Sequence, residues 1–478
     1  MGQPPRDHVC VANKNTKAAA AARIGAELAG RKRDALLGLL RPCFARVEPF
    51  VQARKYVRAV MSDLPARNGW SIAEFTGDES PDKTQRLLNR ASWDALAAMS
   101  VVRKFAVEGL EEAARRRGRR RGLLRVGALD ETGQEKKGEF TAGVKRQHMG
   151  CADGVANGIN TVHLSYVREK TGHVLAGFRQ WIPEEQVKDV RASLAMALPL
   201  DLEFRTKGQL GIEILKDSYA DGLVFDFVCG DEVYGNCTKL RDWLEEQGQA
   251  YVLRVAKNFR ITLRDGTVLT CEDAVVKMLR PRNWEVRSAG RGSKGDRWYA
   301  WAWIQAGDRH SLLIRRHLKT GELAFHYCYV PEGQLCTMTR LVRAAGLRWP
   351  VEEGFEFSKD CFGLDQSQVR LYHAIARHAV LVMASLAICA VTAALLRDRT
   401  DTQAAPPVRP DQPPPASAGM IPLTVPEIRR LLAASEPVPR RPGHAEHWSV
   451  FRREHQARAR WWYQRARLAR STEIALVS

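Results

Sequence analysis

Three acidic side chains stand where they could act together on one reaction. Asp130 and Asp231 each follow an apolar stretch that predicts a β-strand, in VGALDETGQEKKG and LVFDFVCGDEVYG. Ligands of open α/β sheets bind beyond the carboxyl ends of the strands, so we expect both acids in one crevice. The stretch RWPVEEGFEFSKDCFGLDQSQVR supplies a third acid on a predicted helix, where Arg348, Glu352 and Lys359 share one face.

Converging carboxylates repel one another unless cations lie between them. Hard oxygen ligands with open coordination positions suit Mg²⁺ or Mn²⁺. Two such ions, about 4 Å apart, are the usual arrangement for in-line displacement at phosphorus, because one activates the attacking oxygen and the other stabilises the leaving oxygen. The three acids therefore indicate phosphoryl-transfer chemistry.

Composition favours a soluble protein with a polyanionic partner. The chain has 478 residues, of which 45% are apolar, and its 74 Lys and Arg against 54 Asp and Glu give a net charge of +20. This balance favours nucleic acid or an anionic membrane surface and does not choose between them. The cysteines show no metal-binding spacing, which is typical of reduced thiols in a cytosolic protein.

One apolar stretch is long enough to cross a membrane. Residues 379–396, AVLVMASLAICAVTAALL, contain no charged side chain. The stretch is single and only modestly hydrophobic, so we expect a helix buried in a protein core and no membrane partner. The first thirty residues carry charges throughout and lack the apolar core of a secretory signal.

The segment before the first acid is helical in pattern. SIAE at 71–74 has the capping-box pattern of a helix start. A second helix is predicted from near Pro81 to residue 99, with Lys83, Arg86 and Arg90 along one side. Two helices joined by a short turn are compatible with helix-turn-helix DNA binding, and a bundle with solvated charges is the alternative. The run ARRRGRRRG, 114–122, predicts an exposed loop that contacts phosphate.

The rest of the chain predicts an α/β fold with a mixed sheet, preceded by an all-α N-terminal domain. Three strands in a meander come first, and strand and helix then alternate up to about residue 257. The expected domain organisation is a disordered N-terminus (1–25), a helical DNA-binding domain (26–117), the first part of the core (118–257), a β-rich insertion (258–330), the second part of the core (331–400), a Pro-rich linker (401–420) and a basic C-terminal tail (421–478). In the tail, aromatic residues alternate with arginines, as a nucleic-acid surface requires.

Several motifs together resemble a known family. They are LLNRASWD, LDETGQEKKG, GVKRQHMG, GDEVYG with LRDWLEEQG, and RWPVEEGFEFSKDCFGLDQSQVR. With them the chain resembles, from about residue 36 to the tail, the DDE transposases of bacterial insertion sequences, which have an RNase H-like core. The family signature of Arg, Glu and Lys maps onto Arg348, Glu352 and Lys359. The tyrosine that many relatives carry three residues before the Arg is replaced by Ala345, which concerns a phosphate contact and no metal ligand.

The resemblance implies roles for the site residues. Asp130, Asp231 and Glu352 would be the catalytic triad that binds two ions of Mg²⁺ or Mn²⁺. Arg348 and Lys359 would hold or orient DNA phosphate. Arg86 and Arg90 are the candidate DNA contacts of the helix-turn-helix interpretation given above. Lys136 and Lys137 would approach the DNA, and a solvated turn is the alternative for both.

Neighbouring acids compete for two of these assignments. Glu353 is the rival of Glu352 as third ligand, and the helical spacing to Lys359 favours Glu352. Glu131 and Glu232 are expected to point away from the metals, since each follows its aspartate and emerges on the opposite face. In some relatives a tryptophan of the β-rich insertion holds a flipped base. The candidates here are Trp284, Trp298, Trp301 and Trp303, with a place in the sheet core as the alternative.

The implied function is transposition. A transposase of this family cuts a phosphodiester at the end of an insertion sequence and joins the freed 3′-hydroxyl to target DNA. Its partners would be the terminal inverted repeats and the target DNA, bound as a homodimer in the cytoplasm of a bacterium, at the nucleoid. The alternatives are a decayed or domesticated copy that binds element ends and represses, and a stand-alone metal-dependent nuclease of the same fold.

Overall fold

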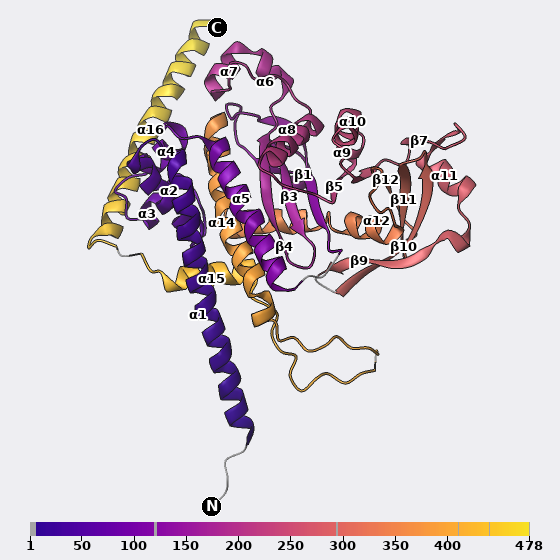
Figure 1. The fold of residues 1–478 in the computed structure, drawn as a ribbon. Coiled ribbons are helices and arrows are strands. Elements are labelled where there is room, and N and C mark those ends of the chain that lie inside the picture. Colours follow the sequence, from indigo (N-terminus) through magenta and orange to yellow (C-terminus); the bar gives the residue numbers. More distant parts are fainter. Residues whose placement is uncertain (1–5, 119–121, 293–294, 410, 439, 478) are drawn as a thin grey trace, which may run out of the picture.

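Helices make up the N-terminal part of the molecule (Figure 1). The computed structural model describes residues 6–118, 122–292, 295–409, 411–438 and 440–477. The N-terminal helices are α1 (Arg6–Leu40), α2 (Val47–Val60), α3 (Gly69–Phe75), α4 (Asp82–Asn89) and α5 (Ala95–Arg116). Residues 6–25 are therefore helical, although the sequence predicted disorder for 1–25. The alanine run at 18–22 explains this, since alanine is the strongest helix former.

Residues 1–5, and 119–121 of the arginine run, lie outside the described residues. Two predicted helix boundaries within the N-terminal part also differ from the structure. Helix α3 begins at Gly69 because Asn68 caps it, accepting hydrogen bonds from the backbone of Trp70 and Ser71. The helix predicted from Pro81 to residue 99 is two helices, because Asp94 caps a new one at Ala95.

A mixed sheet runs through the middle of the molecule. Its strands are β1 (Arg125–Glu135), β2 (Lys145–Met149), β3 (Gly154–Arg168), β4 (Gly172–Gln180), β5 (Phe227–Gly230), β6 (Tyr251–Val255), β9 (Glu285–Gly292), β10 (Gly295–Ala306), β11 (His310–His317) and β12 (Leu323–Tyr329). Within the described residues they follow the order β2-β3-β1-β5-β6-β12-β11-β10-β9, with β4 also paired to β3. Strand β1 is antiparallel to β3 and parallel to β5, and β5 is parallel to β6. This confirms the predicted α/β class with its RNase H-like mixed-sheet core.

The β-rich segment extends this sheet. Strand β12 pairs with β6, so β9–β12 continue the core sheet beyond its last parallel strand. Figure 1 shows them projecting from the core, beside the small sheet of β7 (Arg260–Thr262) and β8 (Val268–Thr270) with α11 (Cys271–Met278). Of the candidate tryptophans, Trp301 is buried, whereas Trp298 and Trp303 are exposed on the same strand. Trp301 is thus part of the sheet core, which was the alternative to a base contact.

Helices of the core surround the sheet. They are α6 (Glu184–Lys188), α7 (Val190–Met196), α8 (Lys207–Ala220), α9 (Glu232–Gly235), α10 (Thr238–Glu246), α12 (Met338–Gly346), α13 (Pro350–Glu356) and α14 (Tyr372–Thr400). Helix α14 is long and apolar enough to span a membrane, yet 89% of its most apolar window is buried within the molecule. It lies beside α5 and β4 (Figure 1). The predicted core helix is therefore where the sequence placed it.

The C-terminal segment, predicted as a basic tail, forms two helices. Among the described residues of the predicted linker, 401–420, there is no helix or strand. Helices α15 (Val425–Ser435) and α16 (His444–Val477) follow. The indole of Trp448 is fully buried, donates to the Asp78 carbonyl at 2.9 Å and packs against Trp70 of α3. The start of α16 is therefore docked on the N-terminal helices, while Trp461, Trp462 and Tyr463 farther along it are exposed.

Candidate active site

Strand pairing places the two aspartates side by side. Leu129 of β1 is paired with Gly230 of the parallel strand β5, so the residues that follow, Asp130 and Asp231, lie next to each other. Asp231 follows the end of β5, but Asp130 lies within β1, which continues to Glu135 and pairs Asp130 with His163 of β3. The expectation that Asp130 ends its strand is therefore wrong, because antiparallel pairing with β3 extends β1 beyond the apolar stretch. Asp231 also caps α9, because its carboxylate accepts the Val233 backbone N–H at 2.9 Å. Two acidic residues thus lie side by side where β5 ends and β1 continues.

The third acid joins them through an arginine. Arg348 lies in the turn between α12 and α13, and Glu352 lies in the first turn of α13. The guanidinium of Arg348 donates to Asp130 Oδ2 at 2.7 Å and to Glu352 Oε1 at 2.9 Å. Arg348 precedes α13 and is not part of it, which corrects the predicted single helix face. The spacing of four residues is nevertheless what lets Arg348 reach Glu352.

Burial and neighbouring charges change the pKa values of Asp130 and Arg348. The side chain of Asp130 is 14% exposed, and burial raises its pKa to about 6, opposed by the positive charge of Arg348 and reinforced by the negative charge of Asp231. Burial lowers the pKa of Arg348, but the carboxylates of Asp130, Glu352 and Asp231 outweigh it and raise that pKa. The guanidinium is therefore the counter-charge that allows the acids to lie close together.

The donor set suits a hard divalent cation. The carboxylates of Asp130, Asp231 and Glu352 are hard oxygen donors on adjoining elements, and the pKa of Asp130 is raised by a second acid beside it. Among the described residues, no three His, Cys, Asp or Glu side chains close round a common point. Two of the acids are instead held to the Arg348 guanidinium. The predicted convergence of three carboxylates is thus not seen, and the metal assignment stays a prediction.

The neighbouring acids are directed elsewhere. Glu353 faces His173, with 3.8 Å between its Oε2 and the histidine Nδ1. Glu131 forms an ion pair with Lys207 of α8, and Glu232 pairs with Arg254 at 3.1 Å. Glu352 is therefore the glutamate of α13 that reaches the Asp130 side of the sheet. The expectation that Glu131 and Glu232 point away agrees with these ion pairs.

The lysines predicted to contact DNA differ in their exposure and hydrogen-bond partners. The ammonium of Lys136 donates to the Ser367 carbonyl at 2.6 Å, and burial lowers its pKa to about 8. Lys137 is exposed. Lys359 lies in a π-helical turn, Phe357–Cys361, beside buried His163, whose pKa is lowered to about 3 mainly by burial and further by the Lys359 charge. This turn displaces Lys359 from the regular helical spacing that the sequence suggested.

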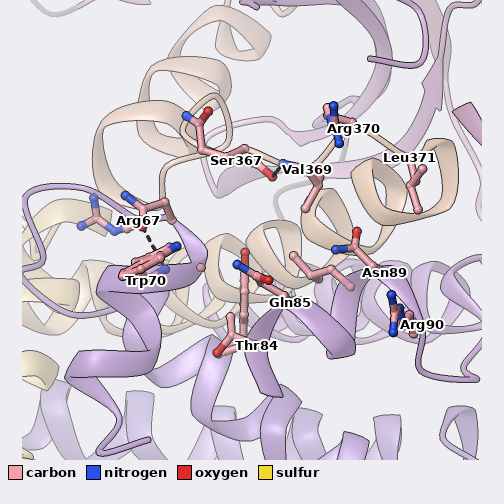
Figure 2. Close-up of a pocket in the computed structure, with 15 residues that line it drawn as sticks. Arg67, Trp70, Thr84, Gln85, Asn89, Arg90, Ser367, Val369, Arg370 and Leu371 are labelled. Atoms are coloured by element: carbon pink, nitrogen blue, oxygen red, sulfur yellow. Dashed lines mark hydrogen bonds between the residues drawn. The ribbon is translucent and has the colours of Figure 1, made fainter. Parts of the chain in front are cut away.

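A groove separates the N-terminal helices from the loop before α14 (Figure 2). Its volume is about 550 Å³. Figure 2 shows Gln85 of α4 and Arg90, which follows that helix, on one side, and Ser367 and Arg370 on the other. Arg86 and Arg90 are exposed, as a DNA contact requires.

Sequence reasoning missed Arg370 as a basic lining of this groove. The residue closes the motif that carries Glu352 and Lys359, and that position is its signal in the sequence. The groove places it opposite Arg90 (Figure 2).

Known proteins share parts of this chain. Residues 39–296 match the family of DDE superfamily endonucleases. Over 214 residues the chain is 26% identical to a protein of Microchaete diplosiphon described as "Probable transposase for insertion sequence element IS701", a match that covers 44% of this chain and 50% of that protein. The chain thus spans about half the length of this curated relative.

A cryo-EM structure of the piggyBac transposase synaptic complex with hairpin DNA has a TM-score of 0.37 and 10% sequence identity, over 74% of this chain and 67% of that chain. The family match, in contrast, covers more than half of the sequence and includes Asp130 and Asp231, while Glu352 lies beyond it. The chain therefore belongs to the family of DDE superfamily endonucleases, as its motifs implied.

Proposed function

We propose that this protein is a transposase that cuts DNA at the ends of an insertion sequence and joins the freed ends to target DNA. Its catalytic residues in this proposal are Asp130, Asp231 and Glu352. The observation that carries it is the Arg348 guanidinium, which joins Asp130 to Glu352 beside Asp231. Residues from distant parts of the chain are thereby joined beside the carboxyl end of β5.

The three carboxylates would hold two ions of Mg²⁺ or Mn²⁺. Such ions, when bound, make water or a 3′-hydroxyl a stronger nucleophile and stabilise the charge on the leaving oxygen. The protein side chains bind and position the DNA. Arg348, which donates to Asp130 and Glu352, would also donate to a phosphate oxygen that lies beside these acids.

The path of the DNA follows the basic surface beside the site. Arg86, Arg90 and Lys137 are exposed and would contact phosphates, with Arg370 across the groove from Arg90 (Figure 2). Lys136 would act indirectly, because its ammonium holds the Ser367 carbonyl of the loop that borders this groove. Lys359 would orient the strand that enters the site.

Cleavage of DNA that carries the element's own ends tests the proposal. Nicking at the ends is expected with Mg²⁺ and not with EDTA. Asp130→Asn, Asp231→Asn and Glu352→Gln should each abolish nicking and leave binding of the ends intact. Glu353→Gln is the matched control, since Glu353 is the next residue on α13 and faces His173. If Glu352→Gln still cut and Glu353→Gln did not, the triad would be wrong.

The partners of this activity are also part of the proposal. The element's terminal repeats and the target DNA would be bound together in the bacterial cytoplasm. Because transposition joins two ends, a homodimer on DNA is expected. Light scattering of the protein with and without a duplex of one element end would measure its size. Specific binding by wild-type protein without any cleavage would instead indicate a repressor of element ends.

A further inference from the structure

A small cavity next to Arg348 gathers arginines from the β-rich segment. It has a volume of about 50 Å³ and lies between the extended sheet and the turn that joins α12 to α13. Its basic lining consists of Arg254 on β6, Arg297 on β10, Arg315 on β11, and Arg348 itself, with His326 of β12 among them. His326 is paired with Arg254 across neighbouring strands, so both side chains project from one face of the sheet.

The arginines of this cavity differ in how their charge is compensated. Arg254 pairs with Glu232, and Arg348 pairs with Asp130 and Glu352. Among the residues that the structure describes, no carboxylate forms an ion pair with Arg297 or Arg315. Arg297 instead donates to the carbonyls of Ala289 and Gly346. Arg315 stacks on the ring of Tyr299, with 4.6 Å from its guanidinium carbon to the ring centre. Burial lowers the pKa of both arginines, and the charge of Arg348 lowers each of them further.

Buried polar atoms of residues that line the cavity lack hydrogen-bond partners within the described part of the chain. In the described part of the chain, Arg297 Nε, Arg315 Nε and His326 Nδ1 are buried without a hydrogen-bond partner. His326 is only 9% exposed, and the cavity is the polar space that it borders. An unsatisfied buried polar group costs about 1–3 kcal/mol. An anion in the cavity would accept hydrogen bonds from the guanidinium groups of Arg297 and Arg315 and offset the repulsion between the arginines.

We propose that this cavity binds a backbone phosphate of the DNA strand, adjacent to the phosphate on which the carboxylates act. The proposal rests on the proposed function, since Arg348 belongs to both places: it lines the cavity and binds Asp130 and Glu352. A guanidinium shared in this way fixes the anion next to the acids. A DNA strand offers consecutive phosphates, so one can lie in the cavity while its neighbour lies at the carboxylates. A free anion can occupy the cavity alone.

Arg315→Gln tests this, with Arg316→Gln as a matched control. Both arginines lie on β11 and stack on an aromatic ring, but Arg316 stacks on Trp284, at 4.2 Å, and is not among the residues lining the cavity. Binding of a duplex of one element end is measured in EDTA at several salt concentrations. Arg315→Gln should weaken binding about tenfold and reduce the slope of log K against log salt by about one. Arg316→Gln should change neither, and Arg315→Lys should recover most of the affinity.

A methylphosphonate scan locates the phosphate. Each phosphate near the cleavage site is replaced in turn by a neutral methylphosphonate. One position should cost the wild-type protein about tenfold in affinity and cost Arg315→Gln nothing further, which is the signature of a direct pair. This coupling is not produced by a structural role of Arg315. Titration with inorganic phosphate alone distinguishes the other source, and tight binding there without coupling to DNA would overturn the proposal.

The failures of the two proposals are separable. If the wild-type protein neither binds nor cuts the ends, the proposed function is wrong. If it does both and Arg315→Gln matches Arg316→Gln, only the phosphate cavity is wrong. If Arg315→Gln does not fold, the methylphosphonate scan of the wild-type protein still decides, because no sensitive phosphate near the cleavage site would overturn the cavity as a site.

Discussion

At the scale of single residues, Arg348 determines how the acids of the site can coexist. Asp130 and Glu352 are both ion-paired to it, and its own side chain is 21% exposed. A buried carboxylate that loses its counter-charge is strongly destabilising. Arg348 and a divalent cation would therefore compete for the same carboxylate oxygens of Asp130 and Glu352. Replacing Arg348 thus tests metal binding without an assay of catalysis.

Replacing Arg348 by Gln should lower the free energy of unfolding by about 1–3 kcal/mol, because Asp130 and Glu352 then repel each other. It should also make Mg²⁺ raise the melting temperature more than in the wild-type protein, since the cation replaces the missing charge. Differential scanning fluorimetry with and without Mg²⁺ measures both effects. Arg343→Gln is the control, because Arg343 pairs with Glu169 and not with these acids. An equal Mg²⁺ shift in all three proteins would contradict the competition.

The sequence could propose Asp130, Asp231 and Glu352 as acids of one site, because acids that follow apolar stretches and a four-residue spacing are local patterns, and this assignment stays a prediction. It could not show that Arg348 binds two of them. The resemblance assigned Arg348 to phosphate, and a guanidinium accepts either a carboxylate or a phosphate as its partner. Whether Arg348 binds a carboxylate or a phosphate depends on which groups the fold brings next to it, here Asp130 of β1. A local sequence pattern does not contain that information.

At the scale of elements, α16 shows that alternating arginines and aromatic residues can serve either protein packing or an exposed surface. Its first turns dock on α3, where Trp448 is fully buried and Arg452 binds Glu74 at 2.6 Å. Its later turns expose Trp461, Trp462 and Tyr463. The sequence predicted one basic tail because aromatic residues serve protein packing and base stacking equally well. The burial of Trp448 depends on a helix nearly 380 residues earlier in the chain, which no local pattern reveals.

Trp448→Ala should release α16 from the N-terminal helices. Truncating a buried Trp typically costs about 3–5 kcal/mol, and here the loss falls on one docked helix. Limited proteolysis should therefore cut residues 436–460 faster in this variant, while the rest of the chain resists as before. Trp462→Ala is the control, because Trp462 is 54% exposed. Equal cleavage rates in the two variants would mean that Trp448 does not anchor the helix.

At the scale of the whole molecule, two parts far apart in sequence build one sheet. The β-rich segment was expected as an insertion, and its pairing with β6 could not be predicted, because strand pairing across long separations leaves little local trace. This pairing has a consequence for function. It carries Arg297 and Arg315 from the segment to the cavity beside Arg348, so the extended sheet and the acidic site are parts of one surface.

The net charge of +20 predicts that binding of DNA depends steeply on salt. Each phosphate contact releases about one counterion, so the exposed distal half of α16 should account for part of the slope. Changing Arg458, Arg460, Arg465 and Arg467 to Gln leaves the docked half intact and should reduce the slope of log K against log salt by about 2–4. Fluorescence anisotropy with one duplex at several salt concentrations measures this. An unchanged slope would place the DNA entirely on the groove and the sheet, and would leave the distal half of α16 free for a protein partner.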